Sequence, residues 1–150
     1  DPQKFLDDYM EKERAFKILS TSLHSANKTA LFDALEAAGI TIVRVHFDGF
    51  GDSGQVEDID PMAGDKPCEF PASTIAIGRA RWGVSDVERI ECNVRDAVEA
   101  LAYAFLQETH SGWEINEGAY GDFTFNVADR SIALDYNQRI ETSEYSQHIF

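Results

Sequence analysis

The sequence contains little cysteine and no long apolar run. Its two cysteines, Cys68 and Cys92, are too few for a disulfide framework and lack the paired spacing of a zinc finger. Its apolar stretches are only a few residues long, whereas a membrane-spanning helix needs about 20. We therefore expect two reduced thiols, as is usual in a cytoplasmic protein, and no transmembrane helix.

Positive charge is also scarce. The 150 residues include 13 Lys and Arg against 27 Asp and Glu, which gives a formal net charge of −14. Nucleic-acid phosphates and anionic lipids repel such a chain, so the composition argues against direct nucleic-acid binding and against membrane binding. The excess acid favours either a basic protein partner or simply high solubility.

Several motifs of catalysis and cofactor binding are missing. The chain has no Gly-x-Ser-x-Gly segment for a nucleophilic serine, and no Cys–His pairing suggests a thiol nucleophile. Residues 49–54 spell Gly-x-Gly-x-x-Gly, but no helix is expected after them to bind a pyrophosphate. The same segment lacks the Gly-Lys-Ser/Thr ending of a phosphate-binding loop. The sequence therefore predicts no cofactor.

The composition, 43% apolar and 27% charged, is typical of one globular domain over residues 1–150. Apolar residues at spacings of three and four predict a helix over residues 4–38, with an interruption in the polar run 20–29 and a C-terminal cap at Gly39. A second helix is predicted over residues 85–109, because Ser85 begins a capping box before a long apolar stripe.

Alternating apolar residues predict strands elsewhere in the chain. The predicted strands are residues 40–47, 55–59, 73–82, 122–127 and 131–136, with a final edge strand at 145–150. Gly49, Gly51 and Gly54 are expected to supply the positive φ angles of a hairpin loop, and residues 60–67 are expected to be a loop. The expected fold class is α+β. A helical segment (1–38) precedes a mostly antiparallel sheet built from hairpins (40–150, with the central helix), and the helices pack on one face of the sheet.

Two glycine-rich segments contain the candidate binding residues. The first, "FDGFGDSGQVED" (residues 47–58), contributes Phe50 and Asp52. The second is "THSGWEINEGAYGD" (residues 109–122), in which aromatic and polar side chains that make good contacts stand among glycines. The candidates from this second segment are Trp113, Glu114, Asn116, Glu117 and Tyr120. A simpler interpretation is that the tryptophan fills the core while the glycines only form turns.

Metal ligation is a weaker hypothesis at the same places. His46 and Asp48 lie two residues apart on a strand and share its polar face, as an acid–base or metal-binding pair would. Asp52, Glu57 and Asp58 could add oxygen ligands, although the spacing does not fit an EF-hand loop. His110 is the candidate from the second segment. The alternative is a strand face exposed to solvent and a plain hairpin. The sequence therefore predicts no metal site and leaves these residues as weak candidates.

The chain resembles a family of small bacterial proteins of unknown function. The resemblance covers residues 30–150 and is most specific in "DGFGDSGQ" and "GWEINEGAYG". It implies a bacterial, cytoplasmic protein of the kind found in alphaproteobacteria and on plasmids and other mobile elements. It assigns no activity and no catalytic residue.

Two functions remain as hypotheses. The first is a non-enzymatic binding or regulatory module whose two glycine-and-aromatic segments contact a protein partner, with the surrounding acids selecting a basic one. The second is a small metal-dependent hydrolase that uses His46, Asp48, His110, Glu114 or Glu117, and it requires the two segments to meet in one cleft. An exposed edge strand near the C-terminus could also pair with a second copy as a homodimer.

Overall fold

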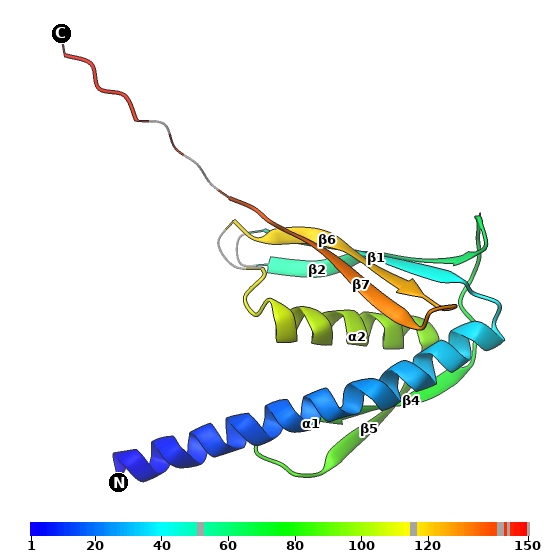
Figure 1. Ribbon diagram of the computed structural model, residues 1–150, viewed down its shortest axis with the longest axis horizontal. Coiled ribbons are helices and arrows are strands. Elements are labelled where there is room, and N and C mark those ends of the chain that lie inside the picture. The colour runs from blue at the N-terminus through cyan, green and yellow to red at the C-terminus, as the bar shows by residue number, and fades with distance from the viewer. Residues whose placement is uncertain (51–52, 115–116, 141–142, 144, 150) are drawn as a thin grey trace.

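Over the residues that the structure describes, the fold combines two helices with seven strands in antiparallel sheets (Figure 1). The computed structural model describes residues 1–50, 53–114, 117–140, 143 and 145–149, apart from the side chains of Phe50 and Ser53. The elements run α1 (Pro2–Ala37), β1 (Ile42–Phe50), β2 (Ser53–Ala63), β3 (Lys66–Pro67), β4 (Thr74–Ala80), β5 (Val87–Asn93), α2 (Val94–Thr109), β6 (Ala119–Asn126) and β7 (Ser131–Gln138). The predicted α+β class is confirmed.

Helix α1 is continuous, so the predicted interruption at residues 20–29 is wrong. Ser25 and Asn27, the residues that would cap a second helix after such a break, lie inside α1, and the hydroxyls of Ser22 and Thr29 donate to carbonyls of the same helix at 2.7 and 3.0 Å. Asn27 instead forms two hydrogen bonds with the backbone of Gly78 in β4, at 2.8 and 2.9 Å. The predicted cap at Gly39 is confirmed, because this residue has φ +76° just after the helix.

Five strands form the main sheet in the order β3-β2-β1-β6-β7. Alternate residues of β1 are buried, and those of β6 alternate in the same way, so each strand has an inner and an outer face. Figure 1 shows both helices on the same side of this sheet. The predicted loop at residues 60–67 is wrong except at residues 64–65, because residues 60–63 are the end of β2 and residues 66–67 are the short edge strand β3.

The predicted helix at residues 85–109 is wrong over its first third. Residues 87–93 form β5, which pairs antiparallel with β4 in a separate two-stranded sheet that places Ile77 opposite Ile90. Helix α2 begins at Val94, and its cap is Asn93, whose side chain accepts the N–H of Asp96 at 2.8 Å. Pairing with β4 therefore decides the conformation of a segment that local spacing assigns to a helix.

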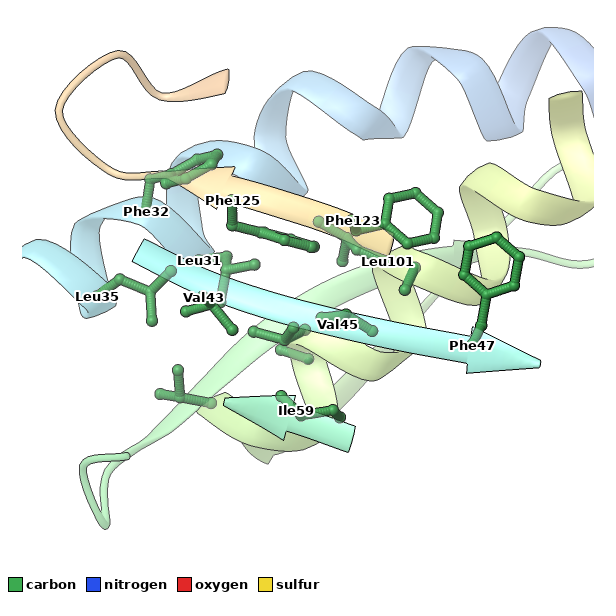
Figure 2. Packing of buried hydrophobic residues seen from close by; sticks show 14 of the residues in the cluster. Leu31, Phe32, Leu35, Val43, Val45, Phe47, Ile59, Leu101, Phe123 and Phe125 are labelled. Atoms are coloured by element: carbon green, nitrogen blue, oxygen red, sulfur yellow. The ribbon is translucent and has the colours of Figure 1, made fainter. Parts of the chain in front are cut away.

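The core lies between the inner face of the sheet and the two helices. Figure 2 shows side chains from the C-terminal end of α1, from α2 and from three strands meeting there. Its fully buried aromatic residues are Phe32, Phe47, Phe123 and Phe125. Burying a side chain of this size contributes roughly 1.5–3 kcal/mol, so this layer contributes much of the stability of the fold.

The chain leaves the sheet after β7 (Figure 1). The predicted edge strand at residues 145–150 is wrong for the part that is described, since residues 145–149 form no strand. Strand β7 itself is an edge of the main sheet. Within the described part of the chain, neither helix combines the length and apolar character that crossing a membrane requires.

Candidate functional site

The two glycine-rich segments meet at one end of the main sheet. Gly49 and Gly54 are paired across β1 and β2, and Trp113 and Glu114 pack directly against them. A Cβ atom at Gly49 would lie 2.8 Å from the Trp113 ring, and one at Gly54 would lie 2.7 Å from Cβ of Glu114. Neither glycine has a positive φ, so the expected turn role is wrong for both. Glycine is needed at both positions because Trp113 and Glu114 approach the backbone too closely to leave room for a Cβ atom.

Trp113 is part of the core. Its side chain is only 6% exposed, and its ring packs edge-on against Phe47 with a centroid separation of 5.4 Å. An enclosed ring contributes shape and burial to the fold but offers little surface to a partner. Trp113 therefore supports the hairpin of β1 and β2 from the inner side.

Glu114, His110 and Tyr136 also lie on the inner side. One carboxylate oxygen of Glu114, Oε2, is enclosed without a hydrogen-bond partner among the described residues. His110 follows the last turn of α2 and stacks on Tyr136 with ring centroids 3.6 Å apart. Burial raises the pKa of the Tyr136 phenol, and the charge of Glu114 raises it further.

The raised pKa of Tyr136 predicts a loss of stability in alkali. The folded protein holds this proton more tightly than the unfolded chain, so the stabilisation is complete below the unfolded pKa of about 10. It declines as the pH rises through the folded pKa. We expect Tyr136→Phe to flatten the fall in the free energy of unfolding above about pH 10, measured by urea titration. Glu114→Gln removes only the smaller cause and should flatten it less. If the free energy of unfolding of Tyr136→Phe falls with pH as steeply as that of the unmodified protein, the raised pKa of Tyr136 is not the cause of the loss.

The outer face of the main sheet is polar and is covered by neither helix (Figure 1). Cross-strand pairing places its residues in rows: Asp58, His46, Asp122 and Asp135 form the middle row, and Asp60, Arg44 and Thr124 form a second. A third contains Gln55, Asp48, Tyr120 and Asn137. Carboxylates outnumber basic groups on this face.

A β-bulge adds Glu57 to the outer face. His46 pairs with Asp58 and the next residue, Phe47, pairs with Val56, so Glu57 is the additional residue in β2. The backbone N–H of Val56 donates to the hydroxyl of Tyr103 in α2 at 2.7 Å, which satisfies a donor beside the disrupted ladder. The bulge brings ligand atoms of His46, Asp48 and Glu57 within 4.8 Å of one another.

Two further residues fix the orientation of this group. Nδ1 of His46 lies 3.1 Å from Oδ1 of Asp122 in β6. Arg139, just after β7, donates to Oδ1 of Asp48 at 2.9 Å and to the carbonyl of Gly49 at 2.7 Å. Its guanidinium also lies over the ring of Tyr120, 4.8 Å from the centroid, and that ring is 40% exposed.

The structure brings some of the predicted residues together and separates others. His46, Asp48 and Tyr120 share the outer face, whereas Trp113 and His110 lie on the inner side. His46 and His110 therefore do not share a cleft, which the hydrolase hypothesis requires. Glu117 lies partly exposed in the turn before β6. The predictions for Asp52, Asn116 and the side chain of Phe50 fall outside the described residues.

No sequence pattern indicates a role for Asp122 or Arg139. Strand alternation alone puts Asp122 on the polar face, but its pairing with His46 depends on the register between β1 and β6, which are far apart in sequence. No local pattern indicates that Arg139 reaches Asp48 and Tyr120. Both are consequences of tertiary structure.

Fold and site together define an α+β protein whose antiparallel sheet has one face covered by helices and one acidic face open. The chain belongs to the family described as a family of unknown function (DUF6878), whose model matches residues 23–150. The first half of α1 precedes the matched region. No curated protein and no solved structure matches the chain.

Proposed function

We propose that this protein is a non-enzymatic binding module that takes a basic segment of a protein partner on the outer face of its main sheet. One observation carries the proposal: neither helix covers this face (Figure 1), and strand pairing makes it rich in carboxylates. The carboxylates are Asp48, Glu57, Asp58, Asp60, Asp122 and Asp135. The arginines beside them are Arg44 and Arg139, and the second is already paired with Asp48.

Tyr120 gives this face an apolar contact. Its ring is 40% exposed, and Arg139 lies over it. A half-exposed tyrosine beside acids suits an arginine or lysine side chain of a partner, which can place its charge against a carboxylate and its alkyl chain on the ring. The two glycine-rich segments then border the contact surface, with Trp113 supporting it from below.

The test is binding of a fluorescently labelled peptide of alternating arginine and alanine, measured by anisotropy at low salt. Neutralising three acids of the outer face, in D58N/D60N/D135N, should weaken binding about tenfold. Three exposed pairs at roughly 0.5 kcal/mol each give that factor. About 0.5 M salt should abolish most of the binding, because exposed charges are screened.

The matched control removes the same charge elsewhere. D7N/D8N/E11Q changes three exposed acids of α1, and it should weaken peptide binding less than about twofold if the outer face is the site. Equal loss in both triple variants would mean that the peptide responds only to net charge. That result, or binding that persists in high salt, contradicts the proposal.

The origin and assembly of the protein are part of the same proposal. The sequence resemblance supports a cytoplasmic protein of bacterial, alphaproteobacterial origin associated with mobile elements, and the neighbouring genes are the observation that tests it. The edge strand β7 supports pairing with a second copy, which sedimentation would detect.

A further inference from the structure

We infer that His46, Asp48 and Glu57 form a binding site for a divalent transition-metal ion, with Zn²⁺ or Mn²⁺ as the class of ligand. The ligand atoms of the three side chains lie within 4.8 Å of one another. Donors to one zinc ion lie about 2.0–2.2 Å from it, so two of them are at most about 4.4 Å apart. Small side-chain rotations therefore suffice to bring all three onto one ion.

The backbone conformation places these three side chains on the same face of the sheet. His46 and Asp48 are alternate residues of β1, so they share one face. Glu57 joins them only because of the β-bulge, which Tyr103 stabilises from the opposite side of the sheet. Bulges occur often next to functional sites because they redirect a side chain.

A second observation points to metal binding. Asp122 engages Nδ1 of His46 at 3.1 Å, which leaves Nε2 as the nitrogen for an ion. Histidines that bind metal commonly have one ring nitrogen held by a carboxylate in this way, which fixes the ring and raises its basicity. Asp122 comes from β6, so a different strand from those of the ligands supplies this orientation.

The chemistry of the three donors selects the class of ion. One imidazole with two carboxylates suits zinc or manganese, whereas Ca²⁺ prefers six to eight oxygens and Mg²⁺ keeps most of its water. Arg139 donates to Oδ1 of Asp48 and competes for part of its charge, but a carboxylate accepts at both oxygens. Three protein ligands leave a further position for water or for a side chain of a bound partner.

Isothermal titration of the chelator-treated protein with ZnCl2 and MnCl2 tests the site. We expect saturable binding of one ion per chain. His46→Ala and Glu57→Gln should each weaken affinity at least tenfold, and Asp122→Asn should weaken it by about 10- to 100-fold through loss of orientation. Tyr103→Phe should weaken it several-fold without removing any ligand. Circular dichroism of the metal-free variants establishes that each is folded.

His110→Gln is the matched control, because His110 lies on the inner side of the sheet and should leave zinc affinity unchanged. Absence of Zn²⁺ and Mn²⁺ binding overturns the inference, as does binding that His46→Ala and Glu57→Gln leave intact. Tight binding of Ca²⁺ or Mg²⁺ independent of His46 also overturns it. The peptide test uses Asp58, Asp60 and Asp135, so metal binding and peptide binding can fail separately.

Discussion

Trp113→Ala is expected to lower the free energy of unfolding by about 3–5 kcal/mol. The indole is only 6% exposed, packs edge-on against Phe47, and fills the space under Gly49 and Gly54. Its removal leaves a cavity that the two glycines, which have no side chains, cannot fill. Urea unfolding followed by far-UV circular dichroism measures the loss.

Trp82→Ala is the matched control for this prediction. Trp82 is 44% exposed. It contacts the N-terminal half of α1 through a hydrogen bond to Glu13, the ring of Tyr9 and the ammonium group of Lys12. We expect a change of about 1 kcal/mol or less. A similar loss of unfolding free energy in the two variants would show that Trp113 does not support the sheet. Packing against Trp113 would then not explain why Gly49 and Gly54 are glycines.

Some elements of the fold could be predicted from the sequence, because one strong local signal fixes each of them. Alternation of Val43, Val45 and Phe47 with polar residues identifies β1 and its buried face, and the same pattern identifies β6 and β7. The positive φ at Gly39 follows equally from its position after a helical stripe.

Prediction failed where a local pattern fits two structures. Val87, Ile90 and Val94 have helical spacing, yet Ile90 and Cys92 also alternate as a strand requires. Pairing with β4, which α1 holds through Asn27, decides between them. No property of residues 87–93 alone contains that information.

In the candidate site, too, local patterns predict some residues, and others depend on tertiary structure. Alternation correctly puts His46 and Asp48 on one polar face. The addition of Glu57 requires a bulge, and the addition of Asp122 requires the register between two strands that are distant in sequence. Aromatic and glycine content indicates a contact residue at Trp113, but the same content also describes a core side chain packed against glycines, which is what Trp113 is.

Gly121→Ala is expected to lower the free energy of unfolding by about 3 kcal/mol, at the upper end of the cost of overpacking. A Cβ atom at Gly121 would lie 2.0 Å from the carbonyl oxygen of Asp135 in β7 and 2.9 Å from the ring of Phe47. The first contact is with backbone, so β6 and β7 must separate locally to relieve it. Urea unfolding measures the effect.

Gly78→Ala separates this clash from the general effect of replacing a strand glycine. Its Cβ would meet only side-chain tips, of Leu23 at 3.0 Å and of Val87 at 3.1 Å, which can move aside. We expect a change of about 1 kcal/mol or less. Gly121 stands between Tyr120 and Asp122, so its substitution should also displace Asp122 from His46 and weaken zinc affinity. If Gly121→Ala is as stable as Gly78→Ala, β6 and β7 do not approach as closely as their pairing requires. The strand register that defines the outer face would then be wrong.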